Sequence, residues 1–283
     1  MCPINYLYNQ KGITIRSKQF DVNTLTDLSR IRKKAVYSST NLIRGALLNE
    51  MHLIFQEYAK SSDEEFIRKR ILHDNIIHKN SFYNRENAWR IYYQRYNICP
   101  DWIKNTLAQA ADRGPKSTEF TSLAYLYYIL HERLVYDFII EDIWNRWMNK
   151  AVSIETQDAQ NFILSKRSEI PQLTSWSEST ILRCSRSMLT ALRDFGLIRG
   201  INKKSLQRMA VTPETIFQLL CILYAEGVRG YNLISSPDWR IFLWRESDVV
   251  EAFLRLAQLR WVRFERSGST IMLEFIRLPG DEP

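Results

Sequence analysis

The chain has 283 residues, of which 45% are hydrophobic and 25% charged, a composition typical of a folded globular protein and not of a disordered one. The net charge is +8 and is unevenly spread: residues 1–100 carry +7, residues 101–150 carry −1, and the remainder carries +2. Two basic zones on either side of a neutral middle favour a polyanionic partner.

The sequence also predicts a cytoplasmic protein without disulfides. Its cysteines (Cys2, Cys99, Cys184 and Cys221) lie far apart and form no CxxC pair, which is typical of reduced thiols. The N-terminus lacks the apolar core of a signal peptide, and the longest apolar run, Leu219–Ala225, is too short to span a bilayer. We therefore expect no membrane partner.

Residues 1–34 alternate weakly and end in the basic run Arg30–Lys34, which predicts an extended N-terminal arm followed by a short helix. A helix that starts within residues 38–40 is expected to run to Tyr58, and Asp63 is expected to cap the next one. Residues 35–150 are expected to form an N-terminal helical domain.

The segment Asn75–Tyr96 consists of a polar turn and a helix that combines aromatic and basic residues. We expect Trp89, Tyr92, Tyr93 and Tyr96 to share one side, with Lys79, Arg85, Arg90 and Arg95 around it. One interpretation is a second helix that faces nucleic acid. The other, which the pattern favours, is an aromatic core stripe with incidental arginines.

From Ser117 to Trp147 the chain is apolar and rich in aromatic residues, which predicts one long central helix that serves as a structural spine. A further helix and a loop around Pro171 follow within residues 151–175. We place the domain boundary there, with residues 151–283 as a C-terminal domain.

The stretch Thr174–Gly200 predicts an amphipathic helix whose start is capped by a serine. Its inward side is expected to hold Ile181, Ser185, Met188, Leu189, Leu192 and Phe195. Its outward side, made only of hydrogen-bond donors, is expected to hold Ser179, Arg183, Arg186 and Thr190.

After this helix come a glycine stop at Gly196, a short strand and a basic loop with Arg199, Lys203 and Lys204. This order is typical of a winged helix-turn-helix recognition helix with its wing. An ordinary surface helix with solvated arginines fits the same residues equally well, so both interpretations stand at this point.

Residues 214–226 and 246–259 predict two more helices, joined by a turn at Ile234–Pro237. Residues 261–276 predict a two-stranded hairpin, because apolar residues alternate on both sides of a Ser-Gly-Ser turn. Arg263 and Arg266 lie towards its tip. The fold class is thus mainly α: a multi-helical two-domain protein with winged helix-turn-helix-like elements and a C-terminal β-hairpin.

No motif of an enzyme is present. The glycines form no phosphate-binding loop, and the histidines lack the spacing of a zinc hydrolase. His73–Asp74 and His131–Glu132 are adjacent pairs, which a helix would point in different directions. We expect no catalytic residue, no cofactor, no metal and no small-molecule substrate.

Four segments together resemble the BrxA family, the small component of BREX (bacteriophage exclusion) loci. They are Tyr37–Tyr58, His73–Tyr96, Leu123–Trp144 and WSESTILRCSRSMLTALRDFGLI from Trp176 to Ile198. The resemblance covers about residues 37–200 and implies a mostly helical, non-enzymatic DNA-binding protein of an antiphage system that also includes a methyltransferase and large ATPases. It also implies a likeness to the RNA-binding antiterminator NusB.

Three hypotheses for function follow: sequence-tolerant binding of double-stranded DNA, binding of structured RNA, or a protein-interaction adaptor for other BREX components. The winged-helix outline favours duplex DNA over RNA, because the major groove of A-form RNA is too narrow for a helix. Charge placement does not separate DNA from an acidic protein partner. The candidate nucleic-acid contacts are Ser179, Arg183, Arg186, Thr190, Arg199, Lys203, Lys204, Lys79, Arg85, Arg90, Arg263 and Arg266.

Overall fold

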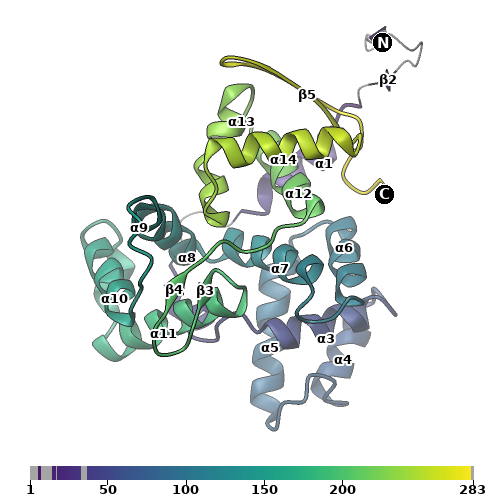
Figure 1. Cartoon of the computed structure of the whole chain (residues 1–283). Coiled ribbons are helices and arrows are strands. Elements are labelled where there is room, and N and C mark those ends of the chain that lie inside the picture. The colour runs from purple at the N-terminus through teal and green to yellow at the C-terminus, as the bar shows by residue number, and fades with distance from the viewer. Residues whose placement is uncertain (1–5, 8–14, 17, 33–36, 282–283) are drawn as a thin grey trace.

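The structure, a computed structural model, describes residues 6–7, 15–16, 18–32 and 37–281. It is mainly helical and ends in an antiparallel β-hairpin, as the sequence predicts (Figure 1). None of the described helices is long and apolar enough to cross a membrane. The first two strands, β1 (Tyr6–Leu7) and β2 (Ile15–Arg16), form an antiparallel pair.

The first half consists largely of helices. They are α1 (Val22–Arg30), α2 (Ser39–Leu42), α3 (Leu48–Tyr58), α4 (Glu64–Leu72), α5 (Phe82–Tyr96), α6 (Asp101–Ala111) and α7 (Thr118–His131). The Asp63 side chain accepts from the first-turn amides of α4, which confirms the predicted cap. Ser81 and Ser117 cap α5 and α7 in the same way.

The single helix expected from residues 38–40 to Tyr58 is wrong, because the chain breaks between α2 and α3. Gly45 and Leu47 take positive φ angles of 71° and 52° there, a backbone conformation that ends a helix. Arg95 stabilises the break by donating hydrogen bonds to the carbonyl oxygens of Gly45 (2.9 Å) and Ala46 (3.0 Å). The loop of residues 43–47 therefore has a fixed shape.

The expected spine is also interrupted. It divides into α7, α8 (Arg133–Asp137), a π-helical turn (Phe138–Ile143) and α9 (Trp144–Met148). Glu132 leaves the helical region, with φ −94° and ψ 80°, and its carboxylate pairs with the buried Arg95. Because the helix ends there, the His131 and Glu132 side chains meet at 3.4 Å (Nδ1 to Oε1), contrary to the expectation that they point apart.

The second half begins with α10 (Thr156–Ser165), two short 3₁₀ turns (Lys166–Ser168 and Pro171–Ser175) and α11 (Glu178–Asp194). There follow β3 (Ile198–Arg199), β4 (Ser205–Leu206), α12 (Pro213–Ala225), α13 (Tyr231–Ser235), a 3₁₀ helix (Pro237–Phe242) and α14 (Glu246–Gln258). The expected turn at Ile234–Pro237 is only partly right, since α13 occupies its first half. The last hairpin, β5 (Val262–Ser267) and β6 (Thr270–Phe275), is confirmed.

One continuous hydrophobic core runs from Leu28 to Phe275, with α7 at its centre (Figure 1). Tyr125 and Tyr127 of α7 donate hydrogen bonds to the carbonyl oxygen of Ile241 (2.6 Å) and to Gln218 (2.5 Å). Helix α7 therefore packs against elements of the second half. The division into domains near residue 150 stays a prediction.

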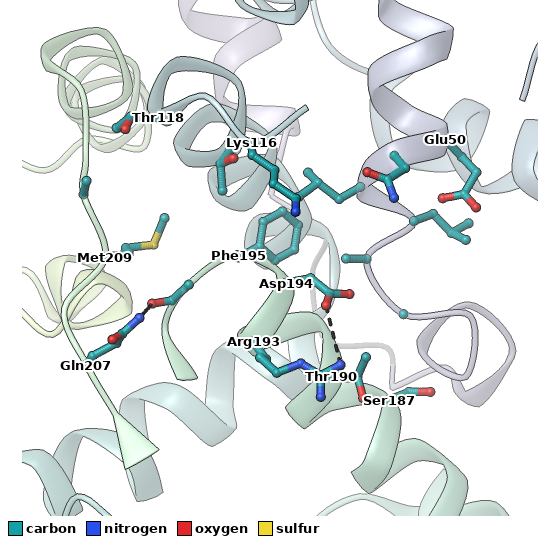
Figure 2. Close-up of a pocket in the computed structure, with 18 of the residues that line it drawn as sticks. Glu50, Lys116, Thr118, Ser187, Thr190, Arg193, Asp194, Phe195, Gln207 and Met209 are labelled. Atoms are coloured by element: carbon teal, nitrogen blue, oxygen red, sulfur yellow. Dashed lines mark hydrogen bonds and ion pairs between the residues drawn. The ribbon is translucent and has the colours of Figure 1, made fainter. Parts of the chain in front are cut away.

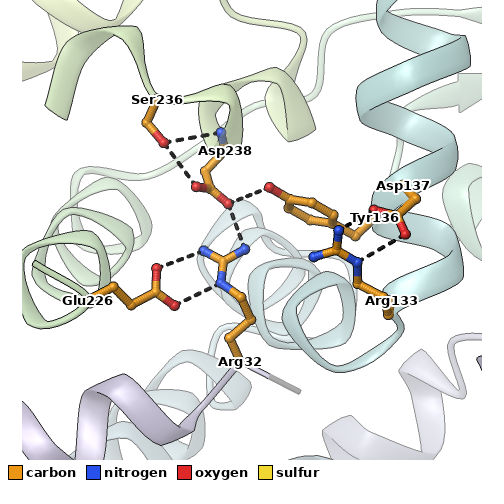
Figure 3. Close-up of polar contacts among 7 residues, drawn as sticks. All are labelled: Arg32, Arg133, Tyr136, Asp137, Glu226, Ser236 and Asp238. Atoms are coloured by element: carbon orange, nitrogen blue, oxygen red, sulfur yellow. Dashed lines mark hydrogen bonds and ion pairs between the residues drawn. The ribbon is translucent and has the colours of Figure 1, made fainter. Parts of the chain in front are cut away.

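The N-terminal basic run is partly neutralised inside the molecule. Arg32 donates hydrogen bonds to both Glu226 oxygens and to Asp238 Oδ1 (2.7 Å), and the Tyr136 hydroxyl also donates to Asp238 (Figure 3). Since α1 also packs against α12, this network fixes the N-terminal helix on the C-terminal half. Arg32 is thus a structural cation. Of the other basic residues of the run, Arg30 is exposed at the end of α1, and Lys33 and Lys34 lie outside the described residues.

Candidate nucleic-acid interface

Helix α11 forms because its sequence combines a cap with a single apolar side. The Ser177 hydroxyl accepts a hydrogen bond from the Thr180 amide (3.2 Å), which satisfies one of the free donors of the first turn. All six residues predicted on the inward side are buried. The helix packs on α10 and α2, so its rotation about its axis agrees with the prediction.

The opposite side of α11 is open to solvent. Ser179, Arg183, Arg186 and Thr190 are all exposed, at spacings of four, three and four residues along one face. Within the part of the chain that the structure describes, neither arginine makes an ion pair or a side-chain hydrogen bond. These guanidinium groups therefore have all their donors available for an external anion.

A small basic hairpin follows this helix. Strands β3 and β4 are antiparallel, with Ile198 opposite Leu206, and Gly200 turns the chain with φ 90°. Arg199 and Lys203 are exposed, and Lys204 is half-buried. A helix followed by a hairpin with cationic side chains is the arrangement predicted for a recognition helix and wing, and the winged-helix assignment itself stays a prediction.

The candidate cations on and near α5 make more contacts within the protein than those of α11. Lys79 forms an ion pair with Glu50, Arg90 donates to Asn87 Oδ1 (3.1 Å), and the Arg85 guanidinium lies over the Phe82 ring. The expected aromatic stripe is wrong at one position, since Tyr92 and Tyr96 are buried but Tyr93 is 44% exposed. These contacts leave the α5 cations less available than those of α11.

Arg95, expected on the surface of this helix, is buried. It lies between Glu132 and the loop carbonyls, and its guanidinium stacks over the Tyr128 ring at 4.8 Å. A guanidinium can be buried this deeply because a carboxylate neutralises its charge and carbonyl oxygens accept its hydrogen bonds. Arg95 is a structural residue of the core.

The C-terminal hairpin stands apart from α11, at the opposite end of the view in Figure 1. Arg263 forms an ion pair with Glu265 in the same strand (2.7 Å), and Arg266 donates to the carbonyl oxygen of Gly268 (3.0 Å). The structure therefore brings together the α11 and β3–β4 candidates, and it does not bring Arg263 and Arg266 to the same surface.

An open cleft of about 820 Å³ lies at the C-terminal end of α11 (Figure 2). Its walls are the second half of α11, the loop of residues 44–47, the first turns of α3 and α7, and residues 207–210. Gln207 donates to the carbonyl oxygen of Gly196 (2.8 Å) and fixes the last of these walls against the end of α11. The cations that line the cleft are Arg44, Lys116, Arg186, Arg193 and Arg208.

Of these five cations, only Arg186 was among the candidate contacts predicted from the sequence, which missed Arg44, Lys116, Arg193 and Arg208. Arg44 lies in the break between α2 and α3, where one continuous helix was expected, and its guanidinium lies over the Tyr83 ring of α5 (5.4 Å). Lys116 directly precedes the serine that caps α7. That cap was a signal that a helix start, and its neighbouring lysine, would lie at a surface; nothing in the sequence indicated which surface.

The described cysteines lack the features of reactive thiols. Cys99, Cys184 and Cys221 are free and buried, in agreement with the expectation of reduced thiols, while Cys2 lies outside the described residues. Burial raises the pKa of Cys184 to about 12, although Arg183 opposes this shift, and burial likewise raises the pKa of Cys99 to about 12. These thiols are protonated at neutral pH and are therefore poor nucleophiles. No group of three or more potential metal ligands occurs among the described residues.

Comparison with known proteins gives one family. A sequence profile of the BrxA family matches residues 35–220. The BREX protein BrxA of Escherichia coli O9:H4 (strain HS) is 22% identical over 176 residues, which cover 62% of this chain and 80% of that protein. A crystal structure of an uncharacterized protein from Magnetospirillum magneticum is similar in fold, with a TM-score of 0.56 at 14% identity over 74% of this chain and 99% of that one.

Proposed function

The chain belongs to the BrxA family, and from this premise we propose that it is a non-enzymatic, DNA-binding component of a BREX phage-defence system. Its proposed partner is double-stranded DNA, bound in the cytoplasm with little sequence preference. The observation that supports this most directly is the exposed face of α11, where Arg183 and Arg186 have no ionic partner among the described residues.

The dimensions of α11 suit the major groove of B-form DNA, which admits one α-helix. In this arrangement Arg183 and Arg186 contact the groove or its phosphates, and Arg199 and Lys203 of the β3–β4 hairpin contact the adjacent backbone. The face offers hydroxyls and guanidinium groups but no Asn or Gln for the bidentate recognition of adenine. Phosphate contacts therefore dominate, and they carry no sequence information.

Structured RNA and acidic proteins are the competing partners. The deep, narrow major groove of A-form RNA excludes a helix such as α11, which favours DNA. Other BREX components remain proposed protein partners, because the curated relative is named as a BREX protein.

The test is a gel-shift comparison of duplex DNA, duplex RNA and single strands of equal length. We expect the duplex DNA to bind most tightly. The variant Arg183→Ala/Arg186→Ala should lose most of this binding, whereas Arg68→Ala/Lys69→Ala, which removes the same charge from exposed positions on α4, should retain it. Equal loss in both variants would show that only net charge matters, and preferred binding of RNA would favour the competing hypothesis.

A further inference from the structure

The cleft at the end of α11 keeps a positive charge after its ion pairs are taken into account. Its two carboxylates are already engaged: Glu50 pairs with Lys79, and Asp194 lies 3.8 Å from the Arg193 guanidinium. Burial also raises the pKa of Asp194, although Arg193 opposes this shift, so the charged form of this carboxylate is disfavoured.

One cation of the cleft is engaged as well. Arg208 makes a bidentate ion pair with Asp248, at 2.9 and 2.7 Å. Three cations, Arg44, Lys116 and Arg186, have no carboxylate partner in the described structure. Arg44 has only a neutral partner, the Tyr83 hydroxyl, to which it donates (3.1 Å). The concave surface therefore holds about three uncompensated positive charges.

Neutral donors surround these cations. The first turns of α3 and α7 both line the cleft. No side chain caps α3, so the amides of its first turn have no side-chain acceptor. The N-terminal ends of helices favour anions. The hydroxyl groups of Thr118, Thr121 and Thr190 add further donors.

The loop that forms one wall is rigidly held. Arg95 donates to the Gly45 and Ala46 carbonyl oxygens, and the Ser187 hydroxyl of α11 donates to the Ile43 carbonyl oxygen (2.9 Å). Arg44 is thus placed by contacts from two different helices, α5 and α11. A site whose donors are fixed before binding loses less entropy when the ligand arrives.

We infer that this cleft is a phosphate-binding site, next to the outward face of α11 and extended by Arg44 and Lys116. The ligand is a phosphate group, either of the nucleic-acid backbone or of a free nucleotide. The volume of the cleft lies within the range of about 300–1,000 Å³ that is usual for small-molecule sites. Arg186 and Thr190 belong both to this cleft and to the exposed face of α11. When α11 lies in the major groove, the cleft therefore binds a backbone phosphate beside that groove.

The experiment has two arms and uses the full chain with Lys116→Gln, Arg44→Gln and the control Lys69→Gln on α4. Lys116 and Lys69 are both exposed and make no side-chain bond with a described residue, so both variants should fold, which thermal unfolding verifies. In the first arm, calorimetry measures binding of inorganic pyrophosphate and of ATP. If the ligand is a free phosphate compound, Lys116→Gln and Arg44→Gln weaken binding about tenfold, as for a lost charged hydrogen bond, and Lys69→Gln does not.

The second arm, which rests on the proposed function, measures the salt dependence of duplex DNA binding. If the ligand is the DNA backbone, Lys116→Gln reduces the log–log slope by about 0.9, the value of one phosphate contact, while Lys69→Gln leaves it unchanged. A wild-type protein that binds no DNA refutes the proposed function, and the first arm still decides on the cleft. The inference is overturned if neither arm separates Lys116→Gln from Lys69→Gln, or if the wild type binds none of these ligands.

Discussion

At the scale of single residues, burial and partners decide what each side chain does. Leu189 and Arg183 belong to the same helix, but Leu189 is 1% exposed whereas Arg183 is in solvent. Leu189→Ala leaves a cavity in the core and should lower the free energy of unfolding by roughly 2–5 kcal/mol. Arg183→Ala should change it by almost nothing. Urea unfolding of both variants measures the difference, and the reverse order would mean that α11 is rotated about its axis.

Arg95 gives the second prediction at this scale. Removing one partner of a buried ion pair leaves an uncompensated charge, so Arg95→Met should cost about 3–5 kcal/mol of stability at pH 7. The comparison is Arg90→Met on the same helix. Among the described residues the half-buried Arg90 side chain donates a hydrogen bond only to Asn87, so this substitution should cost far less. Denaturant unfolding measures both, and equal losses would contradict a special role for the buried pair.

The cost of Arg95→Met should depend on pH. Burial raises the pKa of Glu132, but its hydrogen bond with His131 and the charge of Arg95 outweigh this, and the net effect lowers the pKa. A carboxylate whose pKa is lowered by folding stabilises the protein above its unfolded pKa of about 4.3, and this contribution is lost as the pH falls through the folded pKa. The stability difference between wild type and Arg95→Met should therefore narrow in acid.

At the scale of elements, the two hairpins are alike in outline and differ in their turns. A Cβ atom added at Gly200 would lie 2.1 Å from the Lys203 carbonyl oxygen, whereas one at Gly268 would meet nothing within 4 Å. Gly200→Ala should therefore distort the β3–β4 hairpin and weaken duplex DNA binding. Gly268→Ala, which also replaces a glycine of positive φ, serves as the control.

The measurement is duplex affinity by fluorescence anisotropy, together with thermal unfolding of both variants. Equal DNA affinities of Gly200→Ala and Gly268→Ala would show that the β3–β4 hairpin makes no contact with DNA. A large loss for Gly268→Ala alone would move the contact to the C-terminal hairpin with Arg263 and Arg266.

Elements with local signals could be predicted from sequence. The rotation of α11, the Asp63 cap and the final hairpin follow from periodicity, a side-chain cap and a Ser-Gly-Ser turn, all within a few neighbouring residues. The breaks at Gly45 and Glu132 could not be predicted, because Arg95 stabilises both through contacts distant in sequence. The cleft was missed for the same reason: Arg44, Lys116 and Arg186 come from three separate segments.

At the scale of the whole molecule, the charge distribution led to the hypothesis of two basic surfaces that bind one duplex together. This stays a prediction. If both surfaces engage, a duplex long enough to reach them should bind about 10²–10⁴-fold more tightly than a short one. Arg85→Ala/Arg90→Ala should then remove the advantage of the long duplex. An unchanged advantage in this variant would mean one DNA site, with the α5 surface left for a protein partner.

The central claim is that the exposed face of α11 binds DNA through phosphate contacts, and the salt dependence of duplex binding tests it most directly. Anisotropy titrations between about 50 and 200 mM salt give a log–log slope of about −0.9 for each phosphate contacted. We expect roughly four to eight contacts for the wild type by that relation, and a slope smaller in magnitude by about two contacts for Arg183→Ala/Arg186→Ala. A wild-type affinity that is independent of salt, or a variant with the full wild-type slope, would contradict the claim.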